Sequence, residues 1–468
     1  MNLTSCCDTS NKVSVLIIPF HNNMLFQVLL KAKSWGATAI LIEWEDTFPY
    51  IGQLIEIGSL SNYNGDDMYT MDDVKHILKF AKNNGLEVIQ LIQTIGHMEF
   101  VLKHPVYERL REVPQSPSVL CPSNPEAQSV VRMMLDQALQ VQPDAKYLHI
   151  GADEAWHLAK CLDCETRIAT RDYKLKECLY LDHIQSVATY LKQRRPDLTV
   201  LIWDDMLRPV DFDTLKSYQL GELVEPVVWD YNPLESFYLS PMIWSMYSQL
   251  FSQVWAASAY KGASGSNKMV APVSRYVSNQ EAWIKVIQTH SPTVKFGGIF
   301  LTGWSRYDHY ATLCELLPVS LPSLASCLKV LCKTCDIPNG LLISETLPSD
   351  QWPGEQLALL IRHFDSVRER CREYLRDSVI ETWMNSWQLE HNYINPSKIQ
   401  EVIFRANILL TEILQINNDM IAQLVNFFGP RTVQEWIETN LAPTANELTR
   451  LLATAHQRCI APASVCPT

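Results

Sequence analysis

The dipeptide Asp153-Glu154 is the strongest candidate for chemistry in this chain. It follows a short apolar run and Gly151, and His149 lies four residues before Asp153. Adjacent side chains at a strand end point in different directions, so these two carboxyl groups are expected to have different roles. Proximity of like charges and partial burial would raise the pKa of one and make it a proton donor near neutral pH. The alternative without chemistry is an acidic pair that complements a helix N-terminus.

Carboxylates and aromatic rings also follow other short apolar runs. Indole rings cover the apolar C–H faces of sugars, carboxylates accept hydrogen bonds from sugar hydroxyls, and paired carboxyl groups cleave glycosides. A single tryptophan could equally belong to the core, but the repetition favours a sugar site. The residues in question are Glu45, Asp46, His97, His149, Trp203, Asp204, Trp229, Tyr231, Trp255, Trp304, Arg306 and Asp308.

The elements that must position these groups are eight short apolar runs, typical of parallel strands buried on both faces. They are Val15–Pro19, Ala39–Ile42, Glu87–Ile92, Tyr147–Ile150, Thr199–Ile202, Val227–Val228, Gln253–Ala257 and Gly298–Leu301. Amphipathic stretches between them predict helices, such as Asp72–Asn83. Eight strand–helix repeats indicate an α/β fold, a (β/α)8 TIM barrel over residues 1–335, rather than an open doubly wound sheet. Barrel enzymes carry their chemistry at the carboxyl ends of the strands.

Residues 350–468 predict a C-terminal helical region, joined to the barrel near Thr334–Asp350. The expected helices are Gln356–Arg376, Pro396–Ile413, Asn418–Phe428 and one near Ala445–His456.

Composition limits the partners and the compartment. The 468 residues are 47% apolar, with a net charge of 39 − 51 = −12, which argues against binding nucleic acid or anionic membranes. No apolar run approaches the length of a membrane span. The start of the chain lacks the pattern of a secretory signal, and 13 cysteines, an odd number, suit reduced thiols. We therefore expect a cytoplasmic or nuclear protein with a glycan substrate, and leave a homodimer open.

We expect no cofactor and no metal site. Cys161–Cys164 and Cys332–Cys335 have zinc-like spacing, but about 170 residues separate them and reduced thiols are the simpler interpretation. No Walker loop or Gly-x-Gly-x-x-Gly occurs. His97, His149, His157 and Asp153 could be considered as metal ligands. However, they lack the His-x-His or His-Glu-x-x-His spacing that is typical of metal-binding histidines.

The run His149-Ile-Gly-Ala-Asp153-Glu154 resembles the His-x-Gly-x-Asp-Glu signature of glycoside hydrolase family 20, the β-N-acetylhexosaminidases. The resemblance extends from about residue 24 to about 335, and more loosely beyond. Segments similar to one branch of the family are Leu41–Tyr50, Gln93–His104, Trp203–Met206, Val224–Tyr231, Trp255–Gly262 and Leu301–His309. The resemblance implies exo-hydrolysis of terminal non-reducing β-linked N-acetylhexosamine, GalNAc or GlcNAc, by a substrate-assisted retaining mechanism.

The resemblance also implies roles for single residues. Glu154 would be the general acid and then the base, and Asp153 would hold the acetamido N–H. His149 would orient the acid, and Tyr231 would bind the acetamido carbonyl. Walls around the sugar would come from Trp203, Trp229, Trp255 and Trp304, with further contacts from His97, Glu45, Asp46, Asp204, Arg306 and Asp308.

The chain departs from the family pattern in two places. Gln93 stands where many members carry Asp, and residues 13–21 lack the family's Arg-Gly…Asp pattern. We hypothesise that the first 20 or so residues are a replaced N-terminus, such as an alternative first exon or a misassigned start, with a poorly packed first strand. The alternatives to the implied enzyme are therefore a catalytically weak carbohydrate-binding relative and a conventional retaining glycosidase.

Overall fold

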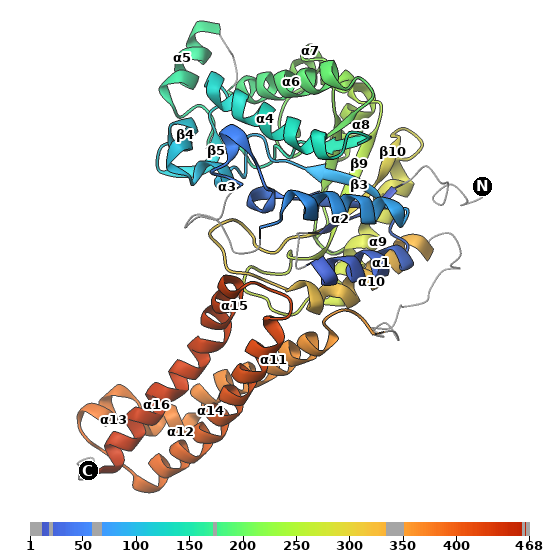
Figure 1. The fold of residues 1–468 in the computed structure, drawn as a ribbon. Helices are drawn as coiled ribbons and strands as arrows, with labels where there is room; N and C mark the ends of the chain where they lie inside the picture. Colours follow the sequence, from blue (N-terminus) through green and yellow to red (C-terminus); the bar gives the residue numbers. More distant parts are fainter. Residues whose placement is uncertain are drawn as a thin grey trace. The chain divides into compact units, whose positions relative to one another are not determined.

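The computed structural model describes residues 12–17, 22–58, 68–171, 176–333, 351–460 and 464. The chain divides into two compact units, which are described separately below. The first contains residues 1–266 and 271–353, and the second contains residues 267–270 and 354–468 (Figure 1).

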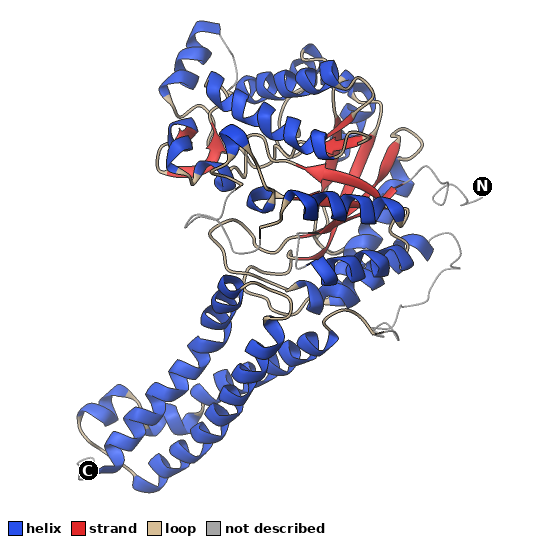
Figure 2. Cartoon of the chain, viewed as in Figure 1, coloured by secondary structure: helices blue, strands red, loops and turns tan. Residues whose placement is uncertain are grey.

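In the first unit, eight parallel strands among the described residues close into a barrel in the order β1-β10-β9-β8-β7-β6-β3-β2 (Figure 2). The predicted (β/α)8 barrel is confirmed, and every predicted apolar run overlaps a strand. The strands are β1 (Lys12–Ile17), β2 (Ala39–Glu43), β3 (Glu87–Leu91), β6 (Tyr147–His149), β7 (Thr199–Trp203), β8 (Glu225–Trp229), β9 (Val254–Lys261) and β10 (Phe296–Gly303).

The barrel interior is a packed apolar core, as expected for strands that bury both faces. Every residue of β2, β9 and β10 is buried. The inward-facing core cluster consists of Leu41, Ile89, Leu91, Leu201, Trp203, Val227, Trp255, Ala257 and Phe300.

Strand β1 pairs with a neighbour on each side although it lacks the family's charged residues. It runs parallel to β10, with Val13 opposite Ile299, and to β2, with Val15 opposite Ile40. The Val15 side chain is fully buried. The rest of the hypothesised replaced N-terminus, residues 1–11 and 18–21, lies outside the described residues.

Helices cover the outside of the barrel. The longer ones are α1 (Asn22–Ser34), α2 (Met71–Asn83), α4 (Pro125–Val141), α6 (Glu177–Arg194), α8 (Pro241–Leu250), α9 (Val273–His290) and α10 (Leu317–Lys333). The predicted helix over Asp72–Asn83 is α2, which begins with a capping box between Thr70 and Asp73. Phe26 of α1 packs on Phe80 of α2 with ring centroids 4.4 Å apart.

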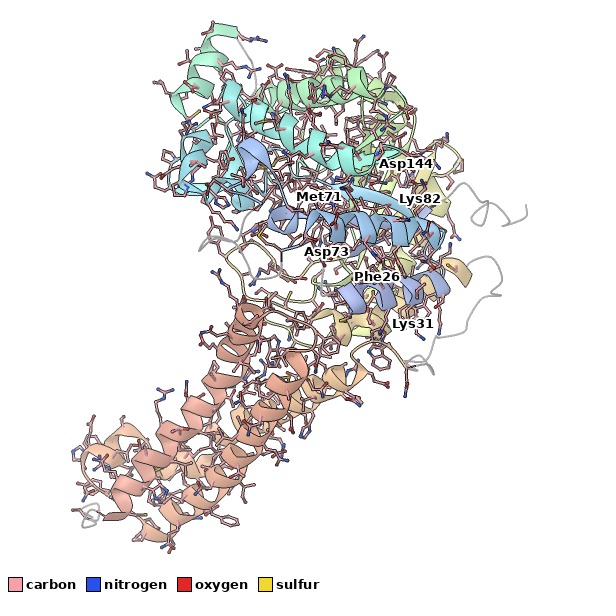
Figure 3. All side chains as sticks on the ribbon, in the orientation of Figure 1. Phe26, Lys31, Met71, Asp73, Lys82 and Asp144 are labelled. Carbon is pink, nitrogen blue, oxygen red and sulfur yellow. The ribbon has the colours of Figure 1, made fainter. Side chains whose placement is uncertain are left out.

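Helix α2 is also tied to the loop that leads into β6. Lys82 near its C-terminal end forms an ion pair with Asp144 (Figure 3). A lysine in the last turn also complements the helix dipole.

Short elements fill the loops between the strands and the longer helices. An antiparallel hairpin of β4 (Arg111–Val113) and β5 (Ser116–Leu120) lies between β3 and α4. The remaining short elements are η1 (Glu45–Thr47), η2 (Gly52–Leu54), α3 (Glu99–Leu102), η3 (Pro105–Leu110), α5 (Leu162–Arg171), α7 (Phe212–Ser217) and η4 (Leu220–Glu222). Polar loops carry little periodic pattern, and the sequence did not predict this hairpin.

The second unit is helical, and α11, α14 and α16 pack along one another. Its elements are α11 (Glu355–Leu375), α12 (Ser378–Trp383), α13 (Ser386–Glu390), α14 (Pro396–Leu424), α15 (Pro430–Trp436), the π-helical turn η5 (Ile437–Leu441) and α16 (Ala442–Ile460). The helical C-terminal region is therefore confirmed, but the two helices expected over 396–428 form one, α14. The predicted junction at Thr334–Asp350 lies wholly outside the described residues.

Across the helices that the structure describes, none combines the length and the apolar character needed to span a membrane.

Candidate active site

Strained backbone is concentrated at the carboxyl ends of β2, β3 and β6. Glu45, His97, Ala152 and Glu154 have positive φ values of 45°, 50°, 69° and 49°. Left-handed backbone is costly for residues with a Cβ and persists where the surroundings over-determine it, often at functional sites. The carboxylates and the histidine at these strand ends are therefore held in fixed positions.

Asp153 and Glu154 share one histidine. Nε2 of His97 lies 3.3 Å from Asp153 Oδ2 and 3.5 Å from Glu154 Oε2. The Asp153 side chain is only 12% exposed, whereas that of Glu154 is 43% exposed. One carboxylate is thus fixed inside the protein and the other is accessible, so the two are placed for different roles.

The amide of Gln93 fixes the inner carboxylate. Its Nε2 donates to Asp153 Oδ1 at 3.1 Å and to Glu43 Oε1 at 3.3 Å, and its Oε1 accepts from Ala152 N. Gly151 makes this arrangement possible, because φ is +61° and a Cβ there would lie 1.9 Å from Gln93 Oε1.

The two aspartates that follow β7 have different environments. Asp205 accepts the backbone N–H of Glu154 at 2.9 Å and the indole N–H of Trp229 at 3.3 Å, so it positions the outer carboxylate. Asp204 is fully buried and forms a bidentate ion pair with Arg208 at 2.6 and 2.7 Å. Asp204, a candidate sugar-binding residue, is therefore already paired with another side chain of the protein.

A second histidine pairs with acids close to His97, since the ligand atoms of His97, Glu99 and His309 all lie within 4.8 Å of one another. Nε2 of His309 lies 3.1 Å from Glu45 Oε1 and 3.6 Å from the buried Glu99 Oε2. Asp46, also a predicted site residue, forms an ion pair with Lys103. Glu45 and Asp46 are therefore both engaged in ion pairs at the end of β2.

The environment of Asp153 does not make it the group whose pKa like-charge proximity and partial burial were expected to raise. Burial opposes the charged forms of both Asp153 and His97, but their attraction outweighs it. The pKa of Asp153 is lowered, and that of His97 is raised to about 12. Raised pKa values belong instead to Glu43, to about 8, and Asp205, to about 7. Burial is the main cause in both, followed by nearby carboxylates.

His149 and three predicted tryptophans form an aromatic wall. The His149 ring lies 4.4 Å from the Trp203 ring, and its Nδ1 accepts the Gly151 N–H at 3.0 Å. Burial lowers the pKa of His149 to about 3, so the ring is neutral. Trp304 packs edge-on against Trp203, with ring centroids 6.1 Å apart and an interplanar angle of 63°. The ring of Trp229 stacks on Tyr231, with centroids 5.2 Å apart and an angle of 20°.

Three other predicted residues do not join this group. The indole N–H of Trp255, near the start of β9, donates to Glu225, the first residue of β8, so it lies towards the amino ends of the strands. Asp308 accepts the backbone N–H groups of Tyr310 and Ala311, both at 2.8 Å, which makes it a turn residue. Arg306 donates to Ala311 O in the same loop.

Sequence reasoning missed Glu43, Asp205, Glu99 and His309 as site residues. All four lie beside predicted site residues, at strand ends or in the loops that follow. The available signal was their place within those acidic and aromatic segments. Their partners lie far away in the sequence, as His309 and Glu45 do, so the pairing itself could not be predicted.

Two groups among the described residues have metal-ligating atoms close together. One, His97, Glu99 and His309, belongs to this site. The pKa values of both histidines are raised, to about 12 and about 9, against the effect of burial, by neighbouring carboxylates that include Asp153 and Glu45. A protonated imidazole has no lone pair for a metal, so these rings act as cations. The second group lies at the β4–β5 hairpin and is treated below.

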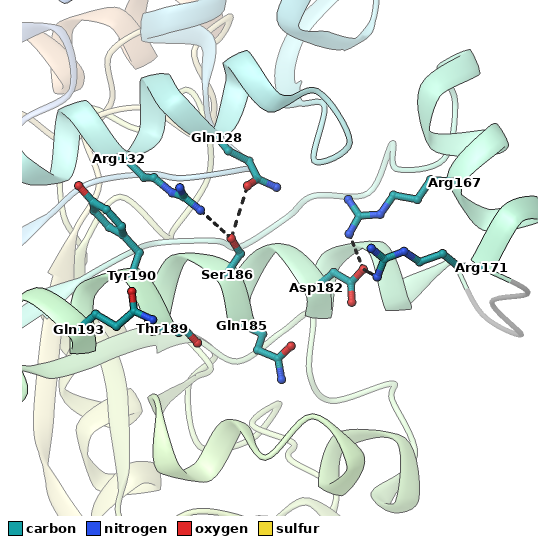
Figure 4. A pocket seen from close by; sticks show the side chains of 10 residues that line it. All are labelled: Gln128, Arg132, Arg167, Arg171, Asp182, Gln185, Ser186, Thr189, Tyr190 and Gln193. Atoms are coloured by element: carbon teal, nitrogen blue, oxygen red, sulfur yellow. Dashed lines mark hydrogen bonds and ion pairs between the residues drawn. The ribbon is translucent and has the colours of Figure 1, made fainter.

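A polar pocket on the outside of the barrel is separate from these strand ends (Figure 4). Its lining comes from α4, α5 and α6, and Arg167 and Arg171 there both pair with Asp182. None of the carboxylates described above lines it. The pocket and the group of carboxylates at the strand ends are therefore made of different residues.

Comparisons with known proteins relate the chain to one family of enzymes. The profile of the glycosyl hydrolase family 20 catalytic domain matches residues 43–231, which span the ends of β2 to β8. The chain is 36% identical to human hexosaminidase D over 439 residues, 90% of this chain and 88% of the relative. It is 41% identical to the Bos taurus hexosaminidase D over 300 residues, 64% of this chain and 84% of that protein.

A solved β-N-acetylhexosaminidase from Bacteroides fragilis NCTC 9343 shares the fold. Its TM-score is 0.50 at 15% identity, over 69% of this chain and 66% of that chain.

Proposed function

The chain belongs to glycosyl hydrolase family 20, and we propose that it uses Glu154 and Asp153 to remove terminal non-reducing β-linked N-acetylhexosamine from glycoconjugates. Its family and its similarity to hexosaminidase D show that it is a β-N-acetylhexosaminidase. The observation that supports the residue roles best is the sharing of His97 by a buried Asp153 and an accessible Glu154.

Glu154 is the proton donor in this proposal. Its greater exposure lets it reach the glycosidic oxygen of a bound substrate, and Asp205 holds its backbone N–H. As Glu154 gives up its proton, negative charge grows on its carboxylate, 3.5 Å from the His97 imidazolium. A charge that is already in place for the transition state lowers the barrier without reorganisation. The same carboxylate then accepts a proton from the incoming water.

Asp153 is the group that holds the substrate's acetamide. In the substrate-assisted mechanism of the family, the acetamido oxygen attacks the anomeric carbon and an oxazolinium-type intermediate forms. A carboxylate bonded to the acetamido N–H orients that oxygen and stabilises the positive charge. The lowered pKa of Asp153, with its bonds to Gln93 and His97, keeps it ionised for this role.

The mechanism has a direct test against a conventional retaining glycosidase. Substrates that lack the acetamido group have no internal nucleophile, so we expect no release of aglycone from β-glucosides or β-galactosides. A thiazoline that mimics the oxazoline should inhibit competitively. Turnover of the plain glycosides, or trapping of a glycosyl group on a protein carboxylate, would support a covalent intermediate instead.

We propose that the choice between GalNAc and GlcNAc is made near Glu45 at the end of β2. Its pairing with His309 gives a charged group for the C4 hydroxyl, and the sugars differ only there. Glu45→Gln should change the ratio of kcat/KM for the two sugars. An equal loss for both would place C4 recognition elsewhere.

We also propose that the protein works in the cytosol or the nucleus. The odd cysteine total and the free cysteines among the described residues favour a reducing compartment. A fluorescent fusion, imaged beside secretory-pathway markers, tests this directly. Co-localisation with those markers would contradict it.

A further inference from the structure

Four side chains with metal-ligating atoms meet beside the β4–β5 hairpin. They are Glu112 of β4, Cys121 just after β5, and Cys161 and Cys164 at the start of α5. Their ligand atoms all lie within 4.8 Å of one another. We propose that these four residues hold a structural Zn²⁺ ion, against our expectation from the sequence that the chain has no metal site.

The spacing of the four atoms matches a tetrahedral zinc site. Sγ of Cys121 lies 3.3 Å from Sγ of Cys161 and 3.7 Å from Sγ of Cys164. Glu112 Oε2 lies 3.3 Å from Cys161 Sγ and 3.2 Å from Cys164 Sγ. Zn–S bonds of about 2.3 Å and Zn–O bonds of about 2.0 Å imply tetrahedral edges of about 3.8 Å between sulfurs and about 3.5 Å from sulfur to oxygen. A small expansion of the cluster would admit the ion.

Burial makes a cation at this place favourable. Glu112 and Cys164 are fully buried, and Cys121 is 2% exposed. Glu112 Oε1 accepts the backbone N–H groups of Lys160 and Cys161 at 2.7 and 3.2 Å, whereas its Oε2 faces the thiols. A buried carboxylate is expensive unless its charge is compensated, and hydrogen bonds from thiols are weak. Zn²⁺ would supply the missing charge.

The surroundings of the sulfurs suit thiolate ligands. The Cys164 N–H donates to Cys161 Sγ at 3.4 Å, and the hydroxyl of Ser123 lies 3.1 Å from Cys164 Sγ. Such outer hydrogen bonds orient metal ligands and spread their charge. Soft thiolates with one carboxylate select zinc over the hard ions Mg²⁺ and Ca²⁺. Binding would release the thiol protons, so occupancy should fall at acidic pH.

A disulfide explains the cluster less well. Three thiols cannot all pair, so one would be left beside the buried carboxylate. Glu112 Oε2 would then face neutral sulfur atoms with no compensating charge. A chelated cation uses all four groups at once.

The position of the cluster gives the ion a role near the active site. Cys161 follows Glu154 by seven residues, and the segment between them ends on the bonds from Lys160 and Cys161 to Glu112. The loop that follows the proposed acid, Glu154, would therefore be linked by zinc to the β4–β5 hairpin. Loss of the ion should loosen this loop without removing any group of the proposed catalytic pair.

Metal analysis of the purified full chain tests the proposal. After expression with zinc and dialysis into metal-free buffer, we expect about one zinc per chain in the wild type, as for a closed structural site. Cys164→Ser and Glu112→Gln should retain much less. Cys327→Ser is the matched control, because Cys327 is a buried thiol of the same unit outside the cluster, and it should retain the full amount.

Cobalt binding is measured on the wild-type protein, so this second test does not depend on whether the variants fold. Reduced wild-type protein titrated with Co²⁺ should develop the strong visible bands of tetrahedral thiolate coordination at about one equivalent. Zinc should also protect three cysteines from alkylation, and a chelator should expose them and lower Tm. No stoichiometric zinc together with no cobalt bands, a disulfide among these cysteines in peptide maps, or full zinc retention by Cys164→Ser would each overturn the proposal.

Discussion

Gln93 and Asp153 are joined by a 3.1 Å hydrogen bond whose donor nitrogen also reaches the buried Glu43. Gln93 replaces an acidic residue of the family pattern, and the structure offers a reason. A third carboxylate between Glu43 and Asp153 would add repulsion, whereas an amide donates to both. The inner part of the site therefore depends on an uncharged linker and on a Glu43 that is protonated near neutral pH.

Glu43→Gln tests this protonation. Burial raises the pKa of Glu43 to about 8, above its ordinary value of 4.5. Between these values the unfolded chain loses a proton that the folded protein keeps, so the wild type loses stability as pH rises. Glutamine does not titrate, so the variant's Tm relative to wild type should increase from pH 5 to pH 8. A Tm difference that is constant over this range would show that Glu43 is ionised throughout.

Gly151→Ala tests the close approach of Gln93. Gly52→Ala is its matched control, since Gly52 has φ +66° with nothing within 4 Å of an added Cβ. Both changes place alanine in the left-handed region at a cost of roughly 1–2 kcal/mol. Only Gly151→Ala must also displace the Gln93 amide. We expect both variants to lose Tm, but only Gly151→Ala to lose most of its kcat. Equal kcat in the two variants would show that the position of the Gln93 amide does not affect catalysis.

Substitution of Asp204 should mainly lower the stability of the protein, whereas substitution of Asp205 should mainly lower its activity. Asp204→Asn breaks the buried pair with Arg208, and such losses cost about 3–5 kcal/mol. Asp205→Asn instead removes a buried carboxyl with a raised pKa and disturbs the support of Glu154. We therefore expect Asp204→Asn to have the lower free energy of unfolding, measured by chemical denaturation. We expect Asp205→Asn to have the lower kcat. Direct sugar binding by Asp204 would appear as a raised KM at unchanged stability.

Asp153→Asn should change both catalysis and the titration of His97. The substitution removes the charge that holds the imidazolium, so the pKa of His97 should fall towards its ordinary value. Loss of the group that orients the acetamide should lower kcat by about 10²–10³-fold, as for other preorganised electrostatic contacts. NMR titration of the His97 ring and steady-state kinetics check the two effects. A His97 pKa unchanged in Asp153→Asn would show that the other neighbouring carboxylates, those of Glu154 and Glu99, set it.

The sequence predicts the barrel well because buried parallel strands are nearly continuous apolar runs. It misplaces the end of β9 because Ser258 is buried there, with its hydroxyl bonded to Phe300 O. The apolar run stops at Ala257, but the strand continues to Lys261. Trp255 consequently looks like a residue of the strand's carboxyl end, although it lies near the strand's amino end.

Long-range pairing limits the prediction of the site. The motif around Asp153-Glu154 points to the strand ends where the carboxylates and His97 meet, but His309 and Glu45 meet only once the barrel has formed. The same holds for the four-residue cluster of Glu112 and three cysteines, where Cys161-x-x-Cys164 indicates half of a metal site. Its other two ligands come from a hairpin that has no clear sequence pattern.

The most direct test of the proposed active site is the release of a fluorescent aglycone from β-GlcNAc and β-GalNAc near neutral pH, with Glu154→Gln measured beside the wild type. Glu369→Gln on α11, an exposed glutamate of the helical unit, serves as the control. We predict turnover of at least one sugar by the wild type and the control, and a loss of about 10²–10⁴-fold in Glu154→Gln, as expected for a general acid. No turnover by well-folded wild-type protein, or full activity in Glu154→Gln, would contradict the account.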